Sequence, residues 1–200
     1  MTDIIMNREW YVDKYEGDAI MAVWGVPYHM PDHASHACLA AVEQQQKLAE
    51  IRPVLKKEFG HEIRIRIGIN SGVVTAGNMG SDKKFQYTVL GDAVNQAARF
   101  EPANKEYGTD IMIGQTTYEE AKDAIEVRML DKIIVMGKTN PIGIYEVLGR
   151  KGEVDTARMQ VVSLYEKGLK LHWERRWDEA LACLDEAIKL DPKDTPSANM

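Results

Sequence analysis

The chain has 200 residues, of which 44% are hydrophobic and 28% charged, a composition typical of a globular protein with one generous domain or one domain plus a small appendage. This balance excludes a disordered or fibrous chain, and no apolar run approaches the ~20 residues of a membrane-spanning helix. The net charge of −6 argues against a protein that wraps nucleic acid. Because Cys38 and Cys183 are the only cysteines, we exclude a disulfide framework and expect a soluble, cytoplasmic protein.

The first third of the chain predicts a hairpin, a helix and a strand. Residues 11–15 and 19–24 read as two extended runs around a Glu-Gly-Asp turn. Asp32 is a good N-cap for a helix over residues 34–51, whose apolar positions recur at near-helical spacing. Residues 63–69 alternate isoleucine with arginine or glycine, which predicts a strand with its arginines on a solvated face.

The middle of the chain predicts further hairpins and helices. Residues 73–76 and 86–90 predict short strands, separated by turn-forming residues over 77–82. The segments that follow are a helix over 93–106, a strand over 110–113, a helix over 116–124 and a closing hairpin of residues 127–135 and 143–147. Helices mixed with adjacent hairpins favour an α+β layered fold over a doubly wound parallel sheet.

The composition changes once, over residues 149–158. Beyond this point residues 160–190 are dominated by alanine, leucine, glutamate and lysine, which predicts helix almost throughout, ending before Pro192. We therefore expect two domains, one over residues 1–149 and a helical hairpin over residues 158–194.

Two segments carry residues that structure alone does not explain. In the first, Lys14 and Asp18 lie four residues apart across the predicted hairpin turn, although a surface hairpin with solvated charges is an equally good interpretation. In the second, a strand passes through a Gly-Asp turn into a helix on which Asn95 and Arg99 project from one face. That face could grip sugar and phosphate, and an exposed polar face is the alternative.

Together the two segments resemble the catalytic domain of class III nucleotidyl cyclases, which make cyclic AMP or cyclic GMP. KYEGDAIMAVWG is similar to the family's metal-bearing hairpin, GINSGVVTAGNMGSDKKFQYTVLGDAVNQAARFE to its substrate-binding strands and helix, and VMGKTNPIGIYEV to its closing hairpin. The likeness runs over residues 2–148 with the motifs in the family's order. It implies an α+β, ferredoxin-like cyclase fold followed by a C-terminal α-helical hairpin.

The resemblance implies a role for each candidate residue. Asp18 would be one of two aspartates that hold a pair of Mg²⁺ or Mn²⁺ ions. Lys14 would donate to the adenine ring and Thr88 would accept from its exocyclic amine, a Lys/Thr pair that looks like selection of ATP. Asn95 would orient the ribose. Arg99, whose planar fork matches phosphate geometry, would stabilise the α-phosphate while the ribose 3′-hydroxyl attacks and pyrophosphate leaves.

The resemblance therefore implies an adenylyl cyclase module that works as a head-to-tail homodimer. Each active site would take its metal-binding aspartates from one subunit and its lysine, threonine, asparagine and arginine from the other. Two alternatives stay open: a non-catalytic ATP-binding or regulatory module, and a protein-interaction protein built around the C-terminal helices.

The sequence departs from the family's pattern at both ends of the domain. The family's first metal-binding aspartate lies on an opening strand that we expect to be absent here, which would leave the chain inactive or very weak. Asp3 and Asp13 are spare carboxylates, but Asp13 adjoins Lys14 on a strand and should point to the opposite face. Met136 stands where the family often has a lysine, so Lys138 is the nearby candidate for the triphosphate; a solvated turn lysine is the alternative.

The C-terminal helices carry a resemblance of their own, to a tetratricopeptide repeat. The positions that match its spacing of small residues, leucine and proline are Gly168, Ala180, Leu184, Ala187 and Pro192. One such repeat cannot bury its own apolar face, so we expect it either to meet a protein partner or to cap the catalytic domain as a helical hairpin.

Overall fold

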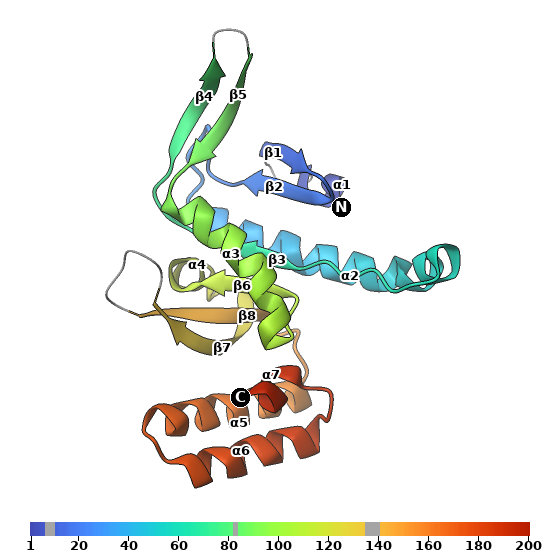
Figure 1. Ribbon diagram of the computed structural model, residues 1–200, viewed down its shortest axis with the longest axis vertical. Coiled ribbons are helices and arrows are strands. Elements are labelled where there is room, and N and C mark those ends of the chain that lie inside the picture. The colour runs from blue at the N-terminus through green and yellow to red at the C-terminus, as the bar shows by residue number, and fades with distance from the viewer. Residues whose placement is uncertain (7–10, 82–83, 135–140) are drawn as a thin grey trace.

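The structure is a computed structural model that describes residues 1–6, 11–81, 84–134 and 141–200 (Figure 1). At its centre is a four-stranded sheet in the order β3-β6-β8-β7. Its strands are β3 (Ile67–Ile69), β6 (Ile111–Gly114), β7 (Ile125–Ile133) and β8 (Ile142–Arg150). The β3–β6 pair is parallel and the other pairs are antiparallel, so the predicted α+β fold is confirmed.

Helices cover both faces of this sheet. The helices are α2 (His33–Phe59), α3 (Asp92–Tyr107) and α4 (Gln115–Ala121). Successive side chains of a strand point to opposite faces, so Ile111 and Ile113 pack with α2 and α4 while Met112 packs with Phe100 of α3. Gly68 lets α3 approach closely, because a Cβ there would lie 2.3 Å from the carbonyl oxygen of Ala97. This contact fixes the helix that carries two of the candidate residues.

Two hairpins project from the end of the molecule opposite the C-terminal helices (Figure 1). They are β1 (Tyr11–Glu16) with β2 (Ala19–Val23), and β4 (Thr75–Ser81) with β5 (Lys84–Leu90). The Tyr11 hydroxyl donates to the carbonyl oxygen of Tyr87 at 2.8 Å, and their rings meet edge to face. The short helix α1 (Thr2–Met6) packs beside the first hairpin and buries Ile5. The two hairpins therefore form one unit.

Most predicted elements are present, but several bounds differ: α2 runs to Phe59 rather than ending at residue 51, and β4 begins at Thr75 rather than at residue 73. Residues 77–81, predicted as a turn, belong to β4 because each pairs with a residue of β5 from Lys84 to Thr88, and this pairing overrides local turn propensity. Residues 63–66, predicted as strand, have no strand partner because the pairing with β6 begins at Ile67. The carbonyl oxygen of Ile65 instead accepts from the Gln45 side chain at 2.7 Å.

The C-terminal segment forms α5 (Thr156–Trp173), α6 (Trp177–Leu190) and α7 (Thr195–Asn199). It packs on the sheet through buried polar contacts: Arg128 of β7 donates to both oxygens of Asp194 at 2.8 Å, and the Tyr165 hydroxyl donates to the carbonyl oxygen of Leu130 at 2.8 Å. These contacts match the helical-cap alternative. The division at residues 149–158 stays a prediction. Within the described residues, no helix has the length and apolar character needed to cross a membrane.

Candidate functional site

Two of the predicted site residues, Lys14 and Thr88, meet where the hairpins touch. The Thr88 hydroxyl donates to Oδ2 of Asp13 at 2.8 Å, and Nζ of Lys14 lies 3.4 Å from the same oxygen. The Asp13 side chain has no exposed surface, whereas the Lys14 side chain is 30% exposed. A buried carboxylate therefore joins the two residues for which the family resemblance implies base recognition.

The direction of the Asp13 side chain differs from the prediction. This side chain was expected to point away from Lys14, but the strand register passes from Val12 opposite Ala22 to Lys14 opposite Met21. Asp13 is thus the extra residue of a β-bulge, where the alternation of faces breaks. Sequence reasoning missed this residue because nothing in the local pattern marks a bulge.

Asn95 and Arg99 lie on the exposed side of α3, one turn apart. The opposite side of the helix is anchored: the Asn70 side chain donates to the carbonyl oxygen of Ala93 at 3.1 Å and to Gln96 Oε1 at 3.2 Å. Within the described part of the chain, no hydrogen bond or ion pair engages the side chains of Asn95 and Arg99. A rigid helix therefore presents an amide and a guanidinium that are free to meet a ligand.

Asp18 is exposed at the tip of the β1–β2 hairpin, next to Gly17, whose φ of +64° favours glycine in that turn. The described residues contain no group of three or more histidine, cysteine or acidic residues placed to hold a metal ion. Asp3 is exposed on α1, and Oδ2 of Asp13 is engaged by Thr88 and Lys14. One carboxylate does not fit a two-metal site, which needs several oxygen ligands.

Lys138, the candidate for the triphosphate, lies outside the described residues, as does Met136. The strands of the closing hairpin, β7 and β8, are present as predicted, with Ile133 paired to Ile142. The structure thus brings Lys14 and Thr88 together, places Asn95 and Arg99 on one helix face, and leaves Lys138 untested.

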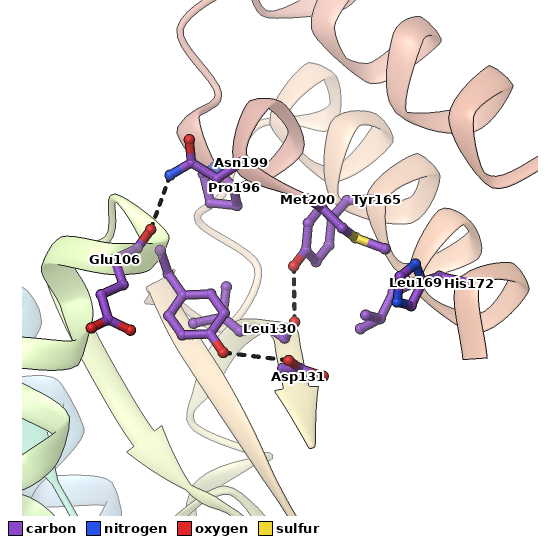
Figure 2. A pocket seen from close by; sticks show the side chains of 10 residues that line it. Glu106, Leu130, Asp131, Tyr165, Leu169, His172, Pro196, Asn199 and Met200 are labelled. Carbon is purple, nitrogen blue, oxygen red and sulfur yellow. Dashed lines mark hydrogen bonds between the residues drawn. The ribbon is translucent and has the colours of Figure 1, made fainter. Parts of the chain in front are cut away.

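A pocket of about 330 Å³ lies elsewhere, between α3, β7, α5 and α7 (Figure 2). Several of its polar groups bond to one another: the Tyr107 hydroxyl donates to Asp131 at 3.4 Å, and the Asn199 amide donates to the carbonyl oxygen of Glu106 at 2.9 Å. Burial, followed by the charge of Asp131, raises the pKa of Tyr107 to about 12. None of the predicted site residues lines this pocket, so it is a gap in the packing beneath the C-terminal helices rather than the predicted site.

Comparison with known proteins identifies the domain. The family model of the adenylate and guanylate cyclase catalytic domain matches residues 1–149. The chain therefore belongs to the family of class III adenylyl and guanylyl cyclase catalytic domains. The resemblance inferred from the two motif-bearing segments is confirmed at this level.

Several relatives are adenylate cyclases. The chain is 30% identical over 155 residues to adenylate cyclase 1 of Rhizobium meliloti (strain 1021), covering 78% of this chain and 23% of that protein. It is 31% identical over 197 residues to the terminal-differentiation specific adenylate cyclase of Dictyostelium discoideum, covering 96% of this chain and 9% of that protein. The chain spans about a quarter or less of the length of these relatives.

Solved structures include both cyclase types. The guanylyl cyclase Cya2 matches with a TM-score of 0.68 and 31% identity, covering 77% of each chain. The adenylyl cyclase CyaB from P. aeruginosa matches with a TM-score of 0.68 and 28% identity, covering 77% of this chain and 79% of that one. Because one neighbour is a guanylyl cyclase and the other an adenylyl cyclase, family membership leaves the choice of purine to the residues of the site.

Proposed function

We propose that this chain is the catalytic module of an adenylyl cyclase, which converts ATP to cyclic AMP and pyrophosphate. The observation that carries the proposal is the convergence of Lys14 and Thr88 on one buried carboxylate, in a domain of the cyclase family. The Lys14 ammonium donates to the adenine ring, and the Thr88 oxygen accepts from the exocyclic amine. This pair supports the assignment of the chain to the Lys/Thr subclass of the family.

The chemistry on the phosphate side falls to α3. Asn95 orients the ribose so that its 3′-oxygen lies in line with the α-phosphorus. A bond forms between these two atoms, the 3′-hydroxyl gives up its proton to water, the bond to the bridging oxygen of pyrophosphate breaks, and pyrophosphate leaves. Arg99 stabilises the negative charge on the α-phosphate oxygens, and its guanidinium keeps its proton throughout.

The exposure of Asn95 and Arg99 supports a shared site in a head-to-tail homodimer. A guanidinium acts on a phosphate far more strongly when water is excluded, and a second subunit covering α3 would exclude it. In that arrangement Asp18, at its exposed hairpin tip, serves the site of the other subunit as a ligand for Mg²⁺ or Mn²⁺. A divalent cation there requires further carboxylates beyond Asp18, so we assign no chemical step to it.

Titration of the chain with ATP and GTP in the presence of Mn²⁺ tests the purine assignment. We expect ATP to bind more tightly, and Lys14→Met to weaken ATP binding by about tenfold, the effect of one unpaired polar group. Lys57→Met, which removes an exposed lysine of α2, is the control and should leave binding unchanged. Equal or tighter binding of GTP by the unaltered chain would contradict the assignment.

A non-catalytic ATP-binding or regulatory module is the second candidate. It is favoured by one observation, the absence of a metal-ligand cluster among the described residues. Such a module would bind ATP without forming cyclic AMP under any metal condition, whether alone or mixed with a second cyclase chain.

The C-terminal helices suggest a protein partner in addition. Trp177 and Leu181 lie one turn apart on α6 and are 51% and 58% exposed, although this helix packs on α5 through its other side. An apolar face of this kind suits the next helix of a tetratricopeptide-like array or a helical partner.

A further inference from the structure

The Asp13 carboxylate is buried, but within the described residues only one of its two oxygens is paired. Its Oδ2 accepts from the Thr88 hydroxyl and faces the Lys14 ammonium, while its Oδ1 is buried and has no hydrogen-bond partner in the described part of the chain. The Gln86 side chain donates to the Asp13 carbonyl oxygen at 2.9 Å and so holds the bulge against β5. Burying a carboxylate with one oxygen unpaired costs stability, which points to a role other than folding.

The hydrogen bond from Thr88 fixes the polarity of its hydroxyl. A hydroxyl has one proton and two lone pairs, and here the proton points to Asp13. Towards any third group, the Thr88 oxygen is therefore an acceptor only. The Lys14 ammonium has three protons and no lone pair, so it is a donor only. Asp13 thus holds one acceptor and one donor side by side.

This pattern complements one class of purine. A 6-aminopurine offers a donor at its exocyclic amine and an acceptor at ring nitrogen N1, whereas a 6-oxopurine offers a carbonyl acceptor and an N1–H donor. The 6-oxopurine would set its carbonyl against the lone pairs of Thr88 and its N–H against the Lys14 ammonium. Both mismatches leave polar groups unpaired, which is the strongest basis for rejecting a near-identical ligand.

We propose that Asp13 is a specificity-determining positioning residue, which selects 6-aminopurine nucleotides by holding the Thr88 hydroxyl as an acceptor beside the Lys14 donor. The inference rests on the proposed function, since it assumes that Lys14 and Thr88 contact the base. Without the carboxylate, the hydroxyl rotates freely and donates to a 6-oxo group as readily as it accepts from a 6-amino group. The purine preference then falls, although Lys14 and Thr88 are both still present.

The test compares ATP with inosine triphosphate, which carries the 6-oxo group and N1–H but lacks the 2-amine of guanine. The dissociation constant of each is measured with Mn²⁺ for the unaltered chain and for Asp13→Ala, which removes the oxygen that accepts from the Thr88 hydroxyl. We expect the unaltered chain to favour ATP, and Asp13→Ala to lower the ratio of the dissociation constant for inosine triphosphate to that for ATP about tenfold or more. Both nucleotides bind the same folded molecules, so this ratio does not depend on how much of the variant is folded.

Two further variants separate positioning from structure. Thr88→Val removes the hydroxyl, and in its background Asp13→Ala should leave the ratio unchanged because no hydroxyl is left to orient. Glu16→Gln, at an exposed carboxylate on the same strand, should leave the ratio at its original value. Asp13→Asn keeps an oxygen that can accept from Thr88 but adds an amide donor, so it should lower the ratio less than Asp13→Ala does.

Each outcome bears on one proposal. A chain that favours ATP and keeps its ratio in both Asp13 variants would overturn the role of Asp13 and leave the proposed function standing. Equal weakening of both nucleotides would show a merely structural residue, and an effect that persists in the Thr88→Val background would show that Asp13 does not act through Thr88. An unaltered chain with no preference for ATP would overturn the proposed function itself.

Discussion

Replacing Asp194 with asparagine should loosen the C-terminal helices. The Asp194 carboxylate is fully buried, accepts from Arg128 at 2.8 Å through both oxygens, and accepts from Arg158 at 2.8 Å. Removing one partner of a buried ion pair costs ~3–5 kcal/mol, because the other charge stays buried without compensation. Arg128 keeps its contact with Glu146, so we expect the lower end of that range, about 3 kcal/mol.

Urea denaturation followed by tryptophan fluorescence measures this loss, since Trp173 and Trp177 both lie in the C-terminal helices. Asp185→Asn is the matched control: it makes the same chemical change on the exposed side of α6. A loss below about 1 kcal/mol for Asp194→Asn, or an equal loss in the control, would refute the reasoning, because Arg128 would then be satisfied without Asp194.

The same carboxylate gives an acid dependence whose sign follows from its pKa. Burial alone would raise the pKa of Asp194, but the hydrogen bond from Ser197 and the charge of Arg128 hold it below the ordinary value of 3.8. Its stabilising contribution is therefore present above about pH 4 and is lost as the pH falls through the lowered pKa. Burial raises the pKa of neighbouring Glu146, which acts in the opposite sense, so the quantity to compare is the difference between the unaltered chain and Asp194→Asn.

Two further predictions concern catalysis. In a chain extended upstream so that it forms cyclic AMP, Arg99→Ala should lower kcat far more than it changes the affinity for ATP, because Arg99 acts on charge that grows in the transition state. Arg64→Ala, at an exposed arginine, is the control, and an unchanged kcat with a raised KM would make Arg99 a ground-state binder. The 200-residue chain alone should form little or no cyclic AMP with Mn²⁺, because Asp18 belongs to no group of three or more possible metal ligands among the described residues. Turnover at an ordinary enzymatic rate, about 1 s⁻¹ or faster, would show that other carboxylates complete the site.

Local sequence patterns predicted the elements whose causes are local. The hairpin around Gly17 was predictable because a Glu-Gly-Asp turn between extended runs has few alternatives, and α2 was predictable because its apolar residues recur at near-helical spacing. The pairing of residues 77–81 with β5 was not, because glycine, asparagine and serine there favour a turn until a partner strand is present.

The candidate site divides in the same way. Asn95 and Arg99 share a helix face, and helical periodicity alone brings them together. Lys14, Asp13 and Thr88 come together only because of a bulge and because two hairpins touch. The hydrogen bond between Thr88 and Asp13 joins residues that are 75 positions apart in sequence. Such contacts follow from tertiary packing, which no short window of sequence contains.

The bulged hairpin has a consequence for how two active sites would influence one another. Lys14 and Asp18 lie on one short hairpin, and Asp13 ties it to β5 through both its side chain and its carbonyl oxygen. In a head-to-tail dimer, Lys14 would contact the base in one site, while Asp18 would be a ligand for the divalent cation in the other site. A nucleotide that shifts Lys14 in one site would then also shift Asp18, which belongs to the second site. Occupancy of one site would therefore change the affinity of the other site for ATP. The hairpin would couple the two sites energetically, and binding curves for ATP would depart from those of two independent sites.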